Sequence, residues 1–204
     1  MNLIQTKLKY FSPDLVSEIA ALEPCYVPIE GNVVRVYTRD GSTFLNQRSM
    51  KAVIKNICAC YNADLKALCA NYGKYLHCKQ DVPIPLSPAL VLIRVKMRRP
   101  LYENDGATGY VNLLDVTGIS APGPDREQEV SCLLDLKGGS SVPSLFSEQN
   151  IRQRLAMADV ALDRFHALQG RERKNEQILK LLESEMHEEE RLKILKVILK
   201  VLNL

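Results

Sequence analysis

The sequence lacks the short motifs that carry most enzyme chemistry. Its three histidines, His77, His166 and His187, lie far apart, and the residues after His187 do not form the His-Glu-x-x-His zinc motif. A P-loop, a dinucleotide glycine fingerprint and a Gly-x-Ser-x-Gly nucleophile turn are also missing. The glycine-rich segment 105–109 lies between two predicted strands and opens no helix, so we do not expect it to cradle a phosphate. These absences predict a protein that is not an enzyme, and an unrecognised active site is the alternative.

Long apolar runs and a leader pattern are missing as well. Hydrophobic residues make up 46% of the 204-residue chain, but no run approaches the roughly 20 residues that span a bilayer. Residues 1–7 lack the basic-then-apolar order and the cleavage site of a signal peptide. Charged residues make up 25%, which is typical of globular proteins. We therefore expect a globular cytoplasmic protein that does not bind membranes.

The sequence contains six cysteines, but it lacks the second pair of closely spaced ligands that a zinc site needs. Cys58 and Cys60 lie two residues apart in a helical pattern, so their side chains diverge. A site that adds Cys69, His77 and Cys78 is the alternative. Because the cytoplasm keeps thiols reduced, we expect free, mostly buried cysteines, no metal and no cofactor. The six are Cys25, Cys58, Cys60, Cys69, Cys78 and Cys132.

Positive charge is concentrated in one third of the chain. Residues 31–99 contain 12 Lys and Arg against three Asp, a net charge of +9. Residues 100–148 contain two basic and eight acidic residues, a net charge of −6. This asymmetry predicts a surface that binds a polyanion such as double-stranded DNA. A basic face that is merely solvated is the alternative.

The most specific basic feature is the segment 93–98, Ile-Arg-Val-Lys-Met-Arg. Successive side chains of a strand face opposite ways, so Ile93, Val95 and Met97 are expected in the core and the three cations on the outer face. Three cations on one rigid face repel each other unless an anion, or acidic side chains across the sheet, neutralise them. Basic residues of the preceding hairpin and helix are expected to assist. The predicted DNA-contacting residues are Arg35, Arg39, Arg48, Lys51, Lys55, Arg94, Lys96, Arg98 and Arg99.

The order of predicted elements indicates an α+β fold, with a mainly antiparallel sheet, inserted helices and a C-terminal helical arm. The Asp40-Gly41 turn between two strands is the clearest hairpin signal, and Ser49 and Asp64 are N-caps of two helices. Ser12-Pro13 is the start signal of another helix. Predicted strands cover residues 32–39, 42–45, 89–100, 110–116 and 130–136, and predicted helices cover residues 12–23, 49–61 and 64–76.

Residues 148–204 are expected to form the helical arm, separate from an α+β domain over residues 1–147. Gly170 is expected to break the arm into two helices. The segment 192–202 is apolar over more than one narrow stripe, so it must bury against another surface. Packing on its own domain is one alternative. The other, a homodimer through the C-terminal helices, suits a DNA regulator that engages two half-sites.

Two resemblances to DNA-binding families rest on short motifs. Residues 30–41 (Glu-Gly-Asn-Val-Val-Arg-Val-Tyr-Thr-Arg-Asp-Gly) and 48–51 resemble the strand–turn–strand–helix opening of LytTR-type DNA-binding domains. Residues 109–113 (Gly-Tyr-Val-Asn-Leu) are similar to a later strand of that family. The two central helices, residues 79–86 and the basic strand resemble ComK-type competence transcription factors. The likeness covers roughly residues 26–120, and the chain lacks the Cys-Trp segment of the second family because it contains no tryptophan.

Both families are bacterial transcription regulators that bind DNA. The resemblances and the charge distribution therefore predict a cytoplasmic transcription regulator that binds double-stranded DNA as a homodimer. A non-catalytic protein-interaction or adaptor module, which docks an acidic partner on the same basic face, is the alternative from another class.

Overall fold

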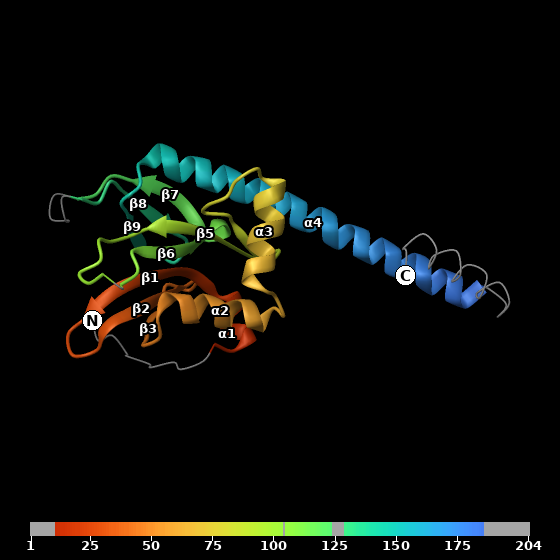
Figure 1. Ribbon diagram of the computed structural model, residues 1–204, viewed down its shortest axis with the longest axis horizontal. Helices are drawn as coiled ribbons and strands as arrows, with labels where there is room; N and C mark the ends of the chain where they lie inside the picture. The colour runs from red at the N-terminus through yellow and green to blue at the C-terminus, as the bar shows by residue number, and fades with distance from the viewer. Residues whose placement is uncertain (1–10, 104, 124–128, 186–204) are drawn as a thin grey trace. The chain divides into compact units, whose positions relative to one another are not determined.

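The computed structural model describes residues 11–103, 105–123 and 129–185 and shows an α+β fold (Figure 1). The chain divides into two compact units, Met1–Asp163 and Arg164–Leu204. No helix in the described ranges is long and apolar enough to cross a membrane.

The helices are α1 (Pro13–Ser17), α2 (Met50–Cys60), α3 (Leu65–Tyr75) and α4 (Glu148–Glu185), with a 3-10 turn, η1, at Leu113–Asp115. The strands are β1 (Ile19–Val27), β2 (Gly31–Thr38), β3 (Thr43–Asn46), β4 (Ile84–Ser87), β5 (Leu90–Lys96), β6 (Thr108–Asn112), β7 (Val116–Ser120), β8 (Cys132–Leu136) and β9 (Ser141–Ser144).

The predicted hairpin is confirmed as β2 and β3, which belong to a six-stranded sheet of order β3-β2-β1-β6-β5-β4. Each neighbouring pair in this sheet is antiparallel. Gly41 adopts a φ of +85° in the turn, and the Asp40 carboxylate accepts a hydrogen bond from the backbone N–H of Ser42 at 2.9 Å. A second, three-stranded sheet has the order β7-β8-β9.

Each face of the six-stranded sheet carries its own hydrophobic core. On one face, which we call the helix-covered face, Leu22 and Leu92 pack with α1, α2 and α3. On the opposite face, Val91 and Ile93 pack with β8, β9 and the first turns of α4 (Figure 1). The first unit therefore has a central sheet whose two faces are both buried, and side chains that alternate along β5 enter different cores.

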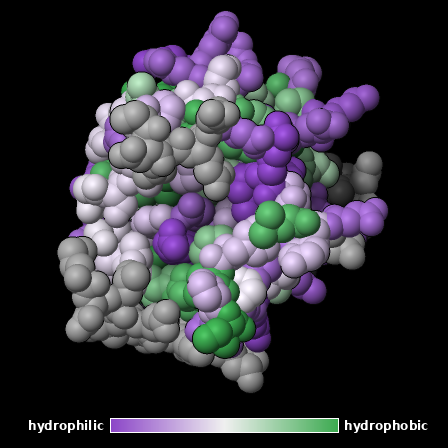
Figure 2. Space-filling view, turned by 90° about the vertical axis from the view of Figure 1, so that its left-hand side faces the viewer, coloured by the Kyte–Doolittle hydropathy of each residue, from purple (hydrophilic) through white to green (hydrophobic). Residues whose placement is uncertain are grey.

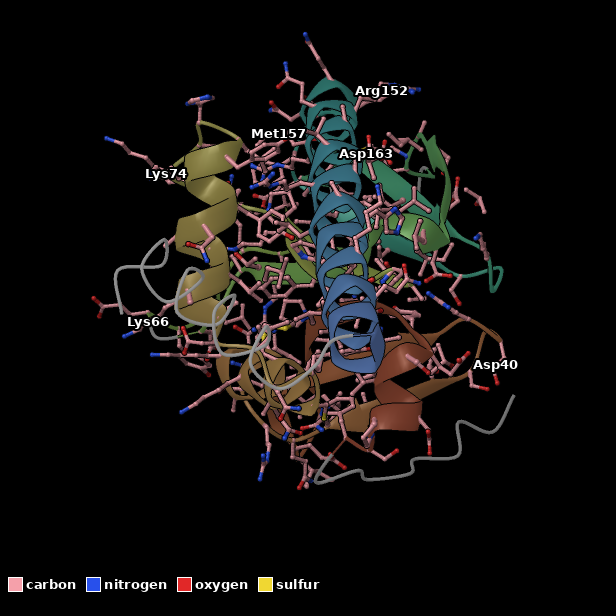
Figure 3. All side chains as sticks on the ribbon, turned by 90° about the vertical axis from the view of Figure 1, so that its right-hand side faces the viewer. Asp40, Lys66, Lys74, Arg152, Met157 and Asp163 are labelled. Atoms are coloured by element: carbon pink, nitrogen blue, oxygen red, sulfur yellow. The ribbon has the colours of Figure 1, made fainter. Side chains whose placement is uncertain are left out.

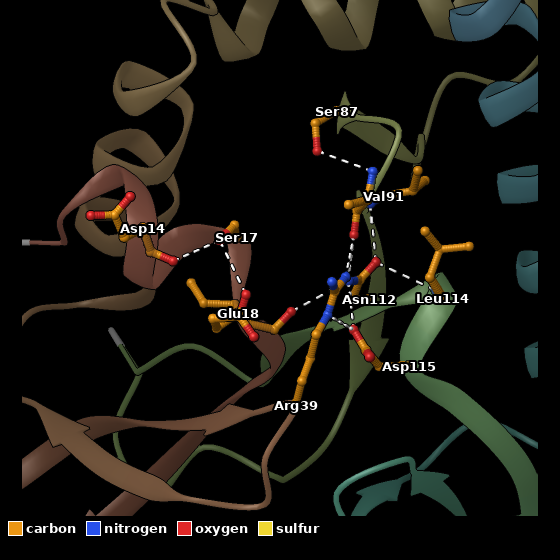
Figure 4. Close-up of polar contacts among 11 residues, drawn as sticks. Asp14, Ser17, Glu18, Arg39, Ser87, Val91, Asn112, Leu114 and Asp115 are labelled. Atoms are coloured by element: carbon orange, nitrogen blue, oxygen red, sulfur yellow. Dashed lines mark hydrogen bonds and ion pairs between the residues drawn. The ribbon is translucent and has the colours of Figure 1, made fainter.

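A buried polar cluster surrounds Asn112, where the chain leaves the six-stranded sheet (Figure 4). Asn112, which has no exposed surface, donates from Nδ2 to the Ala89 carbonyl at 3.0 Å and to Asp115 Oδ2 at 2.7 Å. Its Oδ1 accepts from the backbone N–H of Val91 at 3.1 Å. Arg39 Nε lies 3.0 Å from the buried Asp115 Oδ2, and Arg39 also donates to the Ala89 carbonyl. These contacts satisfy polar groups that would otherwise be costly to bury.

Two predicted element boundaries are wrong. The helix predicted over residues 12–23 ends at Ser17, and β1 begins at Ile19 because residues 19–22 are fully buried within the sheet. That burial overrides the helix propensity of the segment Ile-Ala-Ala-Leu. The strand predicted over residues 110–116 ends at Asn112, where the Asn112 side chain caps η1 and the chain crosses to the second sheet as β7.

The predicted break at Gly170 is also wrong, because α4 is continuous from Glu148 to Glu185. A glycine in a helix interior costs about 1 kcal/mol relative to alanine, which is too little to end a helix flanked by strong helix formers. The apolar segment 192–202 lies outside the described residues.

Candidate nucleic-acid interface

The predicted alternation along the basic strand is confirmed. Ile93, Val95 and Met97 are at most 3% exposed and lie in the core of the opposite face. The intervening cations belong to the helix-covered face, where Lys96 is exposed and Arg94 and Arg98 are half-buried. The strand therefore does present three cations on one side, and their individual environments differ.

Arg98 is held by the neighbouring turns of the sheet. Its guanidinium lies 4.0 Å from the centre of the Tyr26 ring, and Nη2 donates to Asn32 Oδ1 at 2.6 Å. Its Nε donates to the Gly106 carbonyl at 3.0 Å. Asp105 accepts hydrogen bonds from both Tyr26 and Asn32. Arg98 thus joins the β1–β2 turn to the segment that follows β5, which is a structural use of its charge.

Arg94 takes part in a second cluster. Its Nη1 lies 3.5 Å from Asp81 Oδ1, while Arg154 of α4 lies 2.8 Å from the other oxygen of the same carboxylate. Arg154 also packs over the Phe146 ring at 4.2 Å. Two guanidinium groups therefore share one carboxylate, and the Arg94 Nε is buried without a hydrogen-bond partner in the part of the chain that the structure describes.

The other predicted arginines also make contacts within the protein. Arg35 pairs with Glu23 at 3.1 Å on the opposite face of the sheet, where Tyr37 donates to the same carboxylate oxygen at 2.6 Å. Burial opposes the charge of Arg35, but Tyr37 and Glu23 outweigh it and raise the pKa of the guanidinium. Arg39 belongs to the buried cluster described above, and Arg99 pairs with Glu129 at 2.6 Å near the surface.

The exposed lysines of the helices form a different basic surface. Lys51 and Lys55 lie one turn apart on α2, and both are exposed. Lys66 and Lys74 are exposed on α3 and point away from the rest of the first unit (Figure 3). Lys79 is exposed in the segment after α3. None of these five ammonium groups forms an ion pair with another described residue.

We call α2, α3 and the adjoining residues 48–80 the helical layer. It contains six Lys and Arg and one acidic residue, Asp64, which gives a net charge of +5. The Asp64 carboxylate is itself occupied, because it caps α3 by accepting from the Ala67 N–H at 2.7 Å. Arg48, at the start of this layer, is half-buried and has a partner of its own. The layer thus carries an excess of positive charge on one side of the sheet.

The structure therefore separates the nine predicted residues into two groups. Lys51, Lys55 and Lys96 are exposed and form no ion pair with a described residue, whereas the arginines at 35, 39, 48, 94, 98 and 99 have interactions within the protein. Sequence reasoning did not select Lys66, Lys74 and Lys79. All three contribute to the basic third of the chain. Lys66 and Lys74 lie outside the apolar stripe of α3, which would have identified them as exposed.

The turns at one end of the six-stranded sheet are more apolar. Ile29 in the β1–β2 turn is fully exposed with a φ of +72°, and Leu101 and Tyr102 after β5 are 69% and 72% exposed. Figure 2 shows small hydrophobic groups interspersed with hydrophilic side chains on this side of the molecule. The acidic residues Glu103 and Asp105 lie in the same connection, so this end has no clear excess of positive charge.

The chain matches no known protein family, no curated protein and no solved structure.

Proposed function

We propose that this protein is a DNA-binding transcription regulator of the bacterial cytoplasm and that its helical layer lies against the phosphate backbone. The observation that carries this proposal is the net charge of +5 on the helical layer, together with its five exposed lysines that have no ion-pair partner among the described residues. Lys96 of β5 adds a further exposed cation to the same face of the sheet.

The chemistry of lysine suits such a role. An ammonium group is a compact, mobile point charge that attracts phosphate without strict geometry, and each phosphate contact releases a condensed counterion. Such contacts fix the position of a protein on the duplex, and base contacts then supply sequence specificity. Arg94 and Arg98 are not assigned to the phosphate contacts, because their guanidinium groups are already engaged with Asp81, Tyr26 and Asn32.

The experiment is a salt titration of DNA affinity with matched double variants. Lys51→Ala/Lys55→Ala should flatten the slope of log K against log salt by up to about 1.8, since each phosphate contact contributes about 0.9. The control, Lys137→Ala/Arg152→Ala, removes two exposed cations from the β8–β9 turn and from α4 and should leave the slope unchanged. Equal slopes for the two variants would contradict the proposed interface. Absence of DNA binding at low salt would contradict the function itself and favour the adaptor alternative.

A homodimer through the C-terminal helices is part of this proposal. Two copies would engage two half-sites, and the second contact would become effectively intramolecular.

A further inference from the structure

We infer that an open groove beside α3 is a binding site for an organic anion that carries an apolar body. The groove has a volume of about 620 Å³, which lies within the range of small-molecule sites. Its lining combines apolar groups, among them Cys69, Gly73 and Val82, with the basic side chains of Lys74 and Lys79. Lys74 and Lys79 also belong to the helical layer, but this inference does not rest on DNA binding.

The groove exists because the chain folds back onto α3. Gly73 permits this close approach, since a β-carbon there would lie 2.7 Å from the Cys78 carbonyl oxygen and 3.2 Å from Val82 Cγ2. The Cys78 N–H donates to the Gly73 carbonyl at 2.9 Å. His77 and Asp81 both adopt a φ of +53°, a conformation that residues other than glycine seldom adopt. The returning segment is therefore a specifically built feature of the fold.

The electrostatics of the groove favour an anion. Lys74 and Lys79 are exposed and form no ion pair with a described residue. Asp81 is the neighbouring acid, and it is neutralised by Arg94 and Arg154. The immediate surroundings thus carry an excess of positive charge.

The positive charge of Arg94 also acts on Cys69, which lines the groove. Burial raises the pKa of the Cys69 thiol, and the positive charge of Arg94 acts in the opposite direction. The buried Arg94 Nε has no hydrogen-bond partner among the described residues. An anion in the groove would gain from this field, while its apolar body would cover Cys69, Gly73 and Val82.

The ligand class follows from this lining. A carboxylate or phosphate head would lie between the two lysines, and an alkyl chain or a ring would lie on the apolar floor. Inorganic phosphate has only the head and an alcohol has only the body, so neither should bind as well as a molecule that combines both.

The test uses the full chain, labelled with ¹⁵N, and four probes below their micelle concentrations: octyl phosphate, octanoate, inorganic phosphate and octanol. Octyl phosphate or octanoate should shift the amide signals of Ala70, Gly73 and Val82 saturably, with one ligand per chain. The two anionic probes together identify the preferred head. The inference is wrong if neither of them binds or if the shifts map to another part of the chain.

Variants distinguish this site from general attraction. Lys74→Ala/Lys79→Ala should raise the Kd by roughly tenfold or more, as expected for lost charge-assisted contacts. The control, Lys51→Ala/Lys55→Ala, removes two lysines of the same helical layer outside the groove and should leave the Kd unchanged. Ala70→Phe, at an exposed position of α3, should fill the groove and abolish binding without loss of the fold.

Three results would overturn the inference. Inorganic phosphate binding as tightly as octyl phosphate would indicate an adventitious ion only. Octanol binding as tightly would indicate nonspecific apolar contact. Equal weakening by the two lysine double variants would indicate long-range attraction without a site. Because no DNA is present, each of these results is separate from the outcome of the DNA titration.

Discussion

Replacement of Arg39 should reduce stability strongly and should not act through DNA contact. The side chain of Asp115 is 1% exposed, and Arg39 Nε lies 3.0 Å from its Oδ2. Arg39→Ala leaves the carboxylate with Asn112 as its remaining side-chain partner among the described residues. Removing one member of a buried ion pair costs about 3–5 kcal/mol because the other charge stays desolvated. That is a large share of the roughly 5–15 kcal/mol by which a domain is stable.

Urea unfolding followed by circular dichroism measures this loss as a lower midpoint at an unchanged m value. Arg152→Ala is the matched control, because Arg152 pairs with Glu148 at 2.6 Å while the two side chains are 66% and 54% exposed. Such an exposed i,i+4 pair contributes about 0.3–0.5 kcal/mol. If Arg39→Ala destabilised the protein no more than Arg152→Ala, the assignment of Arg39 to the buried cluster would be refuted.

Three further predictions concern packing, pH and assembly. Gly109→Ala should lower the free energy of unfolding in urea by about 1–3 kcal/mol, because the new β-carbon would overlap the Leu22 carbonyl oxygen. Gly106→Ala is the control: its β-carbon would meet no atom within 4 Å, so the free energy of unfolding should change by less than about 0.5 kcal/mol. Burial raises the pKa of Cys58 to about 11, so the folded state keeps a proton that the unfolded state loses from about pH 9 upward. Between about pH 9 and pH 11 the free energy of unfolding should therefore fall with rising pH, and it should fall more steeply in the wild type than in Cys58→Ala. Light scattering should give a dimeric mass for the full chain and a monomeric mass after deletion of residues 190–204, and a monomeric full chain at tens of micromolar would exclude the dimer.

Features set by local chemistry could be predicted from the sequence. The Asp40-Gly41 hairpin and the helices capped by Ser49 and Asp64 form as expected, because turn and capping residues act on their immediate neighbours. The alternation from Ile93 to Met97 is also confirmed, since one core fixes the register of the strand.

Features set by long-range packing could not be predicted in the same way. Strand β1 lacks alternation because cores cover both of its faces, so its start resembles a helix in sequence. The partner of Arg39, Asp115, is 76 residues away in sequence. Arg98, which follows β5, lies over the ring of Tyr26 in β1, and β1 and β5 are not neighbours in the sheet. The charge count therefore located the basic third of the chain without showing which of its cations are already engaged within the fold.

Lysine acetylation in the presence of double-stranded DNA tests the central claim most directly. Mass spectrometry of the full chain, treated with a limiting acetylating reagent, measures the accessibility of each ammonium group with and without a duplex at low salt. The proposed interface predicts that DNA protects Lys51, Lys55 and Lys66, and that Lys137, on the β8–β9 turn, reacts equally in both samples. Equal reactivity of the three helical lysines with and without DNA, or stronger protection of Lys137, would contradict it.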